Sequence, residues 1–227
     1  MRFSLVGREQ ETPDTFSFQF KCDQLKTWKP GQYLHYTLEH KDPDSRGKER
    51  YFTIASAPFE GNVVITTRFA QKSSTFKRAL KGLAVGGTIE ADGLEGDFVV
   101  DDANNQHVFI AGGIGVTPYR AILLDLDHQG LPINAVLLYA NRDGDFFFRK
   151  ELDALAKNHP KFKVSYFVEP ARIDEQAIRG AAVDLKQPIV YVSGPEPMVK
   201  AFDKMLKGMN VPEGHIKTDY FPGYDWP

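Results

Sequence analysis

Short apolar runs with alternating polar positions fill the chain up to Asp101. They are rich in Val, Ile, Thr, Phe and Tyr, and they predict strands over Arg2–Gly7, Thr15–Lys21, Tyr33–Leu38, Tyr51–Ser56, Asn62–Phe69 and Thr88–Asp92. One helix is expected over Thr75–Leu83, with Ser74 as its N-cap. Because an open sheet of such strands would leave two unpaired edges, we expect a small antiparallel Greek-key barrel.

After a polar segment at 101–105, apolar runs alternate with helical periodicity. The runs predict strands over His107–Ala111, Ile133–Tyr139, Lys163–Val168 and Ile189–Val192. The last helix places its apolar residues on one face: Met198, Phe202, Met205, Leu206 and Met209. Alternating strands and helices predict a parallel sheet with a ligand crevice at the carboxyl ends of its strands. We therefore expect two domains, a barrel at 1–101 and an α/β nucleotide-binding domain at 102–227.

Charge and composition exclude several classes of protein. The 28 Lys and Arg against 30 Asp and Glu lack the basic surplus typical of nucleic-acid-binding proteins. The single cysteine, Cys22, excludes an internal disulfide framework and an iron–sulfur cluster held by this chain alone. The six His residues show no metal-ligand spacing, so we expect no metal site. No apolar run reaches the length of a membrane span and no signal peptide is evident, so we expect a soluble, cytoplasmic protein.

A glycine-rich turn, Ala111-Gly112-Gly113-Ile114-Gly115-Val116-Thr117-Pro118, joins a predicted strand to a predicted helix. Glycine lets the backbone approach a diphosphate, and the free N–H groups of a helix start bind anions. Thr117 is expected to be the N-cap and Pro118 the first helical residue. Pro118 replaces the third glycine of the common G-x-G-x-x-G pattern, so a tight turn without a ligand explains this segment equally well on its own.

A second segment, Arg50-Tyr51-Phe52-Thr53, lies on a predicted strand of the barrel. Alternation places Arg50 and Phe52 on one face and Tyr51 and Thr53 on the other. An arginine beside aromatic rings and a hydroxyl suits a phosphate and a planar ring system. Taken alone, the segment is also typical of an ordinary half-exposed strand.

A third segment, Tyr191-Val192-Ser193-Gly194-Pro195-Glu196-Pro197-Met198, completes a set of motifs that resembles the ferredoxin–NADP reductase superfamily. The barrel segment is similar to that family's R-x-Y-[ST], the glycine turn to its G-G-x-G-x-[TS]-P, and the third segment to its C-G-P-x-x-M. Pro30-Gly31-Gln32-Tyr33 is similar to its P-G-Q-[FY]. The motifs occur in family order along the whole chain. The resemblance implies an FAD-binding barrel followed by an NAD(P)-binding domain.

By this resemblance, Arg50 binds the FAD diphosphate, Phe52 stands where the family's Tyr packs on the isoalloxazine, and Thr53 contacts flavin N5. Phe221 is expected to cover one flavin face. Tyr224 or Trp226 would stack on the adenine, or the tail would only pack over the barrel. The remaining FAD-binding residues that the resemblance implies are Tyr51, Thr67, Ser73, Ser74 and Thr75.

The same resemblance implies that the glycine turn lines the diphosphate path of the nicotinamide nucleotide, through Gly112, Gly113, Gly115, Thr117 and Pro118. Asn141 and Arg142 would lie at the adenosine ribose. The nicotinamide would be bordered by Ser193, Gly194, Pro195 and Met198. Arg142 suits the 2′-phosphate of NADP, whereas Asp143 and Asp145 suit the free hydroxyl of NAD. We expect NADP, with NAD as the alternative.

The chain departs from the family pattern at three places. Ser193 replaces the usual Cys beside nicotinamide C4, and Phe52 lacks the hydroxyl of the family's Tyr. The segment Gly93-Leu94-Glu95-Gly96-Asp97-Phe98 has Leu where the family has Pro. None of these changes removes a diphosphate ligand. The implied contacts at the reacting atoms are therefore Thr53, Ser193 and Phe221.

The resemblance implies an enzyme that moves hydride from NAD(P)H to FAD and then passes electrons to a carrier such as ferredoxin or flavodoxin. A basic cluster on the barrel helix would suit an acidic carrier, although a solvated helix face is the simpler interpretation; it comprises Lys72, Lys77, Arg78 and Lys81. Two alternatives are a flavin electron-transfer subunit of a larger oxidoreductase and a flavin-free adaptor of the same fold. Retention of Arg50, Thr53 and the glycine turn disfavours the adaptor.

Overall fold

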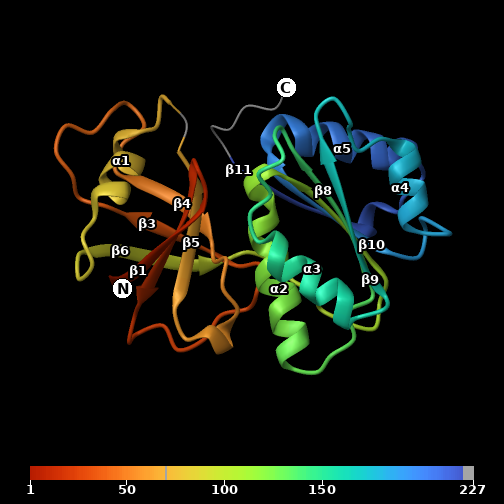
Figure 1. Ribbon diagram of the computed structural model, residues 1–227, viewed down its shortest axis with the longest axis horizontal. Coiled ribbons are helices and arrows are strands. Elements are labelled where there is room, and N and C mark those ends of the chain that lie inside the picture. The colour runs from red at the N-terminus through yellow and green to blue at the C-terminus, as the bar shows by residue number, and fades with distance from the viewer. Residues whose placement is uncertain (70, 222–227) are drawn as a thin grey trace. The chain divides into compact units, whose positions relative to one another are not determined.

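The computed structural model describes residues 1–69 and 71–221. The chain forms two compact units, Met1–Val99 and Val100–Pro227 (Figure 1). The division falls close to the boundary expected after Asp101. No helix in the described part of the chain has the length and apolar character that a membrane crossing requires.

The first unit is a curled antiparallel sheet, as predicted. Its strands, in the order β4-β3-β6-β1-β2-β5, are β1 (Arg2–Thr12), β2 (Thr15–Lys21), β3 (Tyr33–Thr37), β4 (Glu49–Thr53), β5 (Val63–Arg68) and β6 (Thr88–Glu95). Hydrogen bonds beyond the end of β4 link the two edge strands: Ala55 N–H donates to Val64 O at 2.9 Å, and Val64 N–H donates to Ser56 Oγ at 3.0 Å. These bonds curl the sheet into the expected barrel.

Alternate residues of these strands fill the barrel core, with Phe3, Phe18 and Leu34 fully buried. The helix α1 (Thr75–Gly82) contributes Phe76 and Leu80 to the same core. A short 3-10 helix, η1 (Pro58–Glu60), follows β4. The predicted helix at 75–83 is thus confirmed, and its position on the barrel follows from burial of its apolar face.

The second unit contains a parallel sheet of five strands, where the sequence predicts four. Its order is β11-β10-β7-β8-β9, formed by β7 (His107–Gly112), β8 (Ala135–Asn141), β9 (Phe162–Val168), β10 (Ile189–Pro195) and β11 (Ile216–Phe221). The unpredicted strand, β11, lies at the edge beside β10. Edge strands bury less of their surface, and β11 carries Lys217 and Asp219 among its apolar residues, so it lacks the apolar run that predicts the inner strands.

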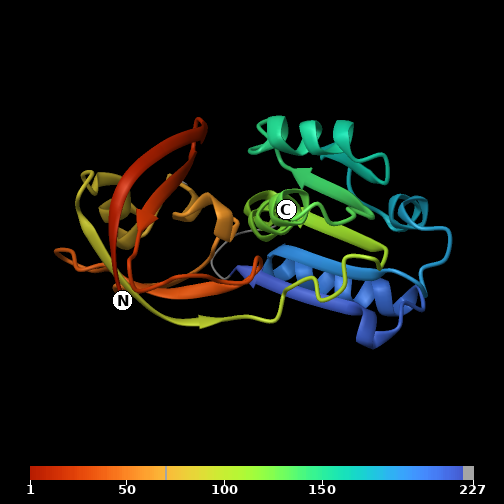
Figure 2. The same ribbon diagram turned by 90° about the horizontal axis from the view of Figure 1, so that it is seen from below.

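Helices cover both faces of this sheet (Figure 2). They are η2 (Gly113–Val116), α2 (Thr117–His128), α3 (Arg149–Asn158), α4 (Glu175–Ala181), α5 (Glu196–Gly208) and η3 (Glu213–His215). Helices α4 and α5 pack on one face with Val108, Ile110 and Val192. Tyr119 of α2 stacks on Phe109 from the other face, with ring centroids 4.8 Å apart. The predicted apolar face of α5 is confirmed, since Met198, Phe202 and Leu206 are buried in the core.

Candidate functional site

The strand order of the second unit creates a switch point between β7 and β10. The chain runs from β7 to β8 and β9, then returns to place β10 on the other side of β7. In open parallel sheets of this kind, ligands bind outside the carboxyl ends of the strands at the switch point. Here those ends carry Gly112, Asn141 and Ser193, and the register pairs Ala111 of β7 with Ser193 of β10. The fold thus brings the glycine turn and the third sequence motif to one place.

The two motifs touch through their backbones. A Cβ built on Gly115 would lie 2.1 Å from Ser193 O, a separation that no side chain tolerates. A Cβ on Gly194 would lie 3.2 Å from Gly112 O and 3.0 Å from Met198 Cε. Gly113 adopts a φ of 52°, in the left-handed region that favours glycine. Gly115 and Gly194 are needed for close approach of the two segments and Gly113 for its backbone conformation, structural roles that sequence alone does not separate from ligand binding.

Thr117 is not the N-cap of α2, contrary to the prediction. The cap is Val116 and Thr117 is the first helical residue, because the turn η2 leads directly into the helix. The Thr117 hydroxyl donates to Ile114 O at 3.0 Å, which leaves its oxygen lone pairs as acceptors. Pro118 consequently follows as the second helical residue, where its lack of an N–H group costs no helical hydrogen bond.

Ser193 has a hydroxyl suited to a ligand. The residue is fully buried, and its Oγ has no hydrogen-bond partner within residues 1–69 and 71–221. An unsatisfied buried hydroxyl costs about 1–3 kcal/mol, and a polar ligand group relieves this cost. Nearby, Tyr119 donates to Ile110 O at 3.1 Å. Burial raises the pKa of Tyr119 well above its ordinary value, so it remains a neutral donor.

The residues around Ser193 complete this edge of the sheet. Met198 is fully buried beneath Gly194, and Pro195 stands at the start of α5. Phe221 is half-buried at the end of β11, opposite Pro195 in the register. Its role as a flavin cover stays a prediction. Tyr224 and Trp226 lie outside the described residues.

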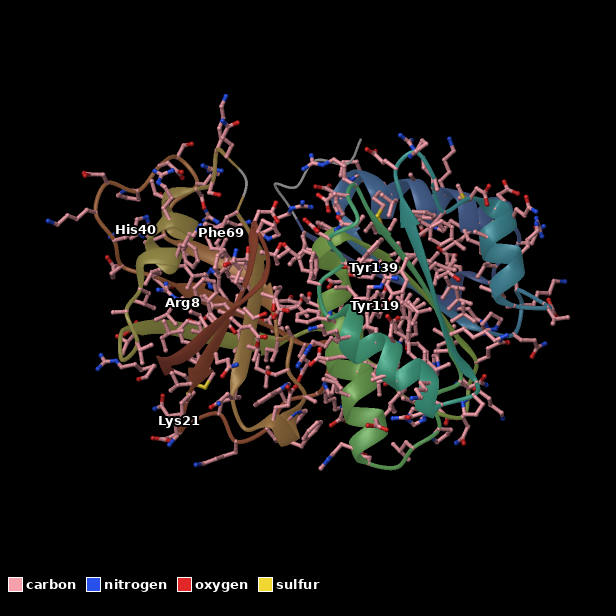
Figure 3. All side chains as sticks on the ribbon, viewed as in Figure 1. Arg8, Lys21, His40, Phe69, Tyr119 and Tyr139 are labelled. Atoms are coloured by element: carbon pink, nitrogen blue, oxygen red, sulfur yellow. The ribbon has the colours of Figure 1, made fainter. Side chains whose placement is uncertain are left out.

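Asn141 organises the loop that follows β8. Its side chain accepts from Arg142 N–H at 3.0 Å and donates to Asp145 O at 2.9 Å and Asp143 Oδ1 at 3.2 Å. Asn141 is buried, whereas Arg142 is exposed. Tyr139, two residues earlier on β8, is fully buried inside the second unit, as is Tyr119 (Figure 3). A ribose contact by Asn141 or Arg142 stays a prediction.

The first unit contains a separate anion-binding arrangement at the start of α1. Ser74 is the N-cap, as predicted, and its Oγ accepts from Lys77 N–H at 3.2 Å. The Arg50 guanidinium lies over the Phe76 ring, 5.3 Å from its centroid. It donates to Arg46 O at 2.6 Å and to Glu49 O. Its Nη2 is buried and has no partner in the part of the chain that the structure describes.

These features fit a bound diphosphate. The N-terminus of a helix presents free N–H groups and a positive dipole end to anions. Burial lowers the pKa of Arg50, but a guanidinium stays charged at neutral pH. Arg50 Nη2, which has no partner among the described residues, is therefore a charged donor with spare capacity beside the first turn of α1.

Sequence reasoning missed two residues at this position, Asp44 and Arg46. Thr75 N–H donates to Asp44 Oδ2 at 3.0 Å, and Arg46 holds the same carboxylate through Nη2 at 2.7 Å. Hydrogen bonding from the Arg46 side chain keeps the pKa of Asp44 well below its usual range. The loop that carries both residues has the composition of an ordinary turn. Asp44 and Thr75 are 31 positions apart, so no local sequence pattern predicts that this loop contacts α1.

Of the remaining predicted residues of the barrel, Phe52 and Tyr51 follow strand alternation, whereas Thr53 is buried although alternation places it on the face of exposed Tyr51. Phe52, 8% exposed, packs against Tyr36 and Phe76 with centroid distances of 5.9 Å. Tyr51 points to the other face, is 60% exposed, and stacks on His35 at 4.5 Å. Thr53 and Thr67 are both buried, and Ser73 O accepts from Arg78 at 2.6 Å. Contact of these residues with FAD stays a prediction.

Comparison with known proteins assigns the family. Residues 109–204 match the family model described as an oxidoreductase NAD-binding domain. The chain is 31% identical over 238 residues to the stachydrine N-demethylase reductase subunit Stc4 of Rhizobium meliloti, covering 96% of this chain and 67% of that protein. It is 27% identical over 233 residues to a flavohemoprotein of Pseudomonas putida, covering 96% of this chain but only 58% of that relative. The chain thus spans little more than half of the flavohemoproteins it matches.

Solved structures show the same fold. The FAD/NAD-binding domain of nitric oxide dioxygenase from Vibrio cholerae matches with a TM-score of 0.81 at 18% identity, covering 97% of this chain and 98% of that one. A ferredoxin NADP+ reductase from Neisseria gonorrhoeae with bound FAD and NADP matches with a TM-score of 0.81 at 16% identity, with the same coverage of 97% and 98%. As its sequence motifs predict, the chain belongs to the ferredoxin–NADP reductase superfamily, whose members are NAD(P)H-dependent oxidoreductases with FAD as cofactor.

Proposed function

We propose that this protein oxidises NAD(P)H by hydride transfer to FAD and passes the electrons to a carrier protein. The observation that supports it best is the glycine turn packed against Ser193 and Gly194 at the switch point of the parallel sheet. This arrangement offers backbone N–H groups to a diphosphate and, to the adjoining part of the same ligand, the Ser193 hydroxyl, which has no partner in the described part of the chain. A nicotinamide dinucleotide has both features.

Each unit contributes binding and orientation. When bound, FAD supplies the redox chemistry, since it accepts a hydride and releases electrons singly. Arg50 and the N-terminus of α1 hold the FAD diphosphate, and Thr53 orients the flavin. Ser193 orients the nicotinamide, and the glycine turn holds the diphosphate of the nucleotide. Correct positioning of the reactants supplies much of the acceleration in such reactions.

A small electron carrier such as ferredoxin or flavodoxin is the proposed acceptor. The basic cluster at α1, of which Lys72 lies before the helix, does not add support. Lys77 Nζ donates to Arg68 O at 3.0 Å, and Lys81 Nζ lies 4.8 Å and 5.1 Å from the ring centroids of Phe16 and Phe69. Two of its four cations, Lys77 and Lys81, therefore bind groups of the barrel itself. This favours a solvated helix face over a docking site for an acidic carrier.

Service as the reductase subunit of an oxygenase is the second candidate. The names of two relatives support it: the stachydrine N-demethylase reductase subunit, and a glycine betaine monooxygenase reductase subunit of Chromohalobacter salexigens, 27% identical over 231 residues. The chain covers 67% and 61% of these proteins. An oxygenase component would then take the electrons. Cytoplasmic location and preference for NADP stay predictions.

The visible absorption spectrum of the purified protein tests the proposal. Flavin bands that NADPH or NADH bleaches under anaerobic conditions would support the reductase and identify the donor. Bound flavin that neither nucleotide reduces would favour a subunit that needs its partner. Protein that stays colourless after incubation with FAD would contradict the proposal and favour the flavin-free adaptor.

A further inference from the structure

The carboxylate of Asp44 occupies the anion-binding position at the start of α1. It accepts from Thr75 N–H at 3.0 Å, from Arg46 N–H at 3.1 Å, and from Arg46 Nε and Nη2 at 3.3 Å and 2.7 Å. Charged hydrogen bonds of this kind are the stronger ones in proteins. A backbone N–H at a helix start together with a guanidinium is also the donor set that binds a phosphate oxygen.

The contact is tertiary, because Asp44 lies in the loop between β3 and β4. Asp44 N–H in turn donates to Thr75 Oγ1 at 3.0 Å, so the two residues are joined by a reciprocal pair of hydrogen bonds. His40, in the same loop, lies beside α1 (Figure 3) and meets Phe76 edge-on at 6.4 Å. The loop is therefore folded against the first turn of the helix.

Both arginines of the site are held by acceptors of this loop and the start of β4. Arg46 binds the Asp44 carboxylate, and Arg50 donates to Arg46 O and Glu49 O. Buried polar groups left over nearby are Arg50 Nη2 and His40 Nε2, neither of which has a partner within the described residues. The loop and the start of β4 thus supply acceptors to Thr75 N–H and to both arginines, and Arg50 Nη2 is left without an acceptor among the described residues.

We propose that Asp44 is an internal competitor for the FAD diphosphate, and this inference rests on the proposed function. A phosphate oxygen and the Asp44 carboxylate accept from the same Thr75 N–H and repel each other as like charges. FAD binding exchanges one anion for the other and releases the loop. Asp44 therefore lowers the affinity for FAD and makes the flavin exchangeable, while it keeps the start of α1 capped in the free protein.

The substitution Asp44→Asn tests this competition. The amide keeps an oxygen acceptor for Thr75 N–H but removes the charge, so FAD is expected to bind about 2- to 5-fold more tightly, judged from the modest strength of partly exposed charge pairs. Titration of apoprotein with FAD, followed by flavin fluorescence at low salt, measures the change. Riboflavin lacks the diphosphate, so its affinity should be the same in both proteins. Asp44→Ser, which also retains an acceptor, is the second variant.

Glu39→Gln is the matched control, since Glu39 lies in the same loop and pairs with Lys48 away from Thr75. This control should leave FAD affinity unchanged. Equal or weaker FAD binding by both Asp44 variants would overturn the inference, as would an equal gain for riboflavin or for the control. If wild type binds FAD and only the expected gain is missing, the proposed function survives. If no protein binds FAD, both fail.

Discussion

Gly115 and Ser193 meet backbone to backbone, with a Cβ on Gly115 placed only 2.1 Å from Ser193 O. Ser193 lies on the inner strand β10, which is paired with β11 on one side and β7 on the other, so its backbone cannot easily move away from Gly115. A residue other than glycine at 115 must therefore displace the turn that begins α2. The close approach ties the stability of the second unit to the geometry of its ligand site.

Gly115→Ala is expected to destabilise the protein by ~3 kcal/mol, the upper range for overpacking a rigid interior. Nucleotide binding should fall together with stability because the displaced turn carries the expected diphosphate contacts. Urea unfolding, with NADPH binding measured below the transition, tests both effects. Gly208→Ala at the end of α5 is the control, since nothing lies within 4 Å of its added Cβ. Equal unfolding midpoints for wild type and Gly115→Ala would contradict the steric argument.

Arg50→Ala is expected to weaken FAD binding roughly 10- to 100-fold, the range for losing a hydrogen bond to a charged group. Arg50→Lys should recover only part of this, because an ammonium lacks the planar fork of the guanidinium. Flavin content after dialysis and fluorescence titration measure the loss. Arg179→Ala provides a control, since the Arg179 side chain is exposed on α4 and pairs with Glu175. Full flavin content in the alanine variant would remove Arg50 from the diphosphate site.

Local patterns predicted most of the fold and the positions of the main motifs. Strand alternation correctly separated Arg50 and Phe52 from Tyr51, and helix chemistry correctly identified Ser74 as a cap. Strand alternation and helix capping both depend on residues a few positions apart, so they can be read from the sequence. Thr117 was misassigned because the 3-10 turn before it continues into α2 without a break.

Non-local contacts escaped prediction. The edge strand β11 lacks an apolar run, and the loop at Asp44 meets α1 only through tertiary folding. The same holds for the glycines: their sequence suggested phosphate binding, but Gly115 is required by the backbone of Ser193, 78 positions later (193 − 115). A glycine motif can therefore reflect packing as well as ligand binding, and the packing of Gly115 against Ser193 is visible only in the folded structure.

His107 makes the stability of the second unit sensitive to acid. It is 2% exposed and stacks on Phe109 at 5.7 Å. Burial lowers its pKa from the ordinary 6.5 to about 4. Because the folded pKa lies below the unfolded value, the full stability is present above pH 6.5 and is lost as the pH falls toward 4, by about 3 kcal/mol at most.

Urea unfolding of wild type and His107→Gln at pH 7.5 and pH 5 tests this. We expect the substitution to reduce the difference in unfolding free energy between the two pH values. His128→Gln, on the exposed end of α2, should retain the full difference. The same pH dependence in wild type and His107→Gln would assign the acid sensitivity to other groups.

Ser193→Ala separates function from stability at the switch point. Because the Ser193 hydroxyl is buried without a partner among the described residues, its removal should leave the unfolding free energy unchanged or slightly higher. The rate of flavin reduction by NADPH should fall about 10-fold, since a group that orients the nicotinamide is lost. Stopped-flow reduction under anaerobic conditions measures the rate, and Ser193→Cys, the family's usual residue, should restore it. A loss of stability without a change in rate would make Ser193 a packing residue.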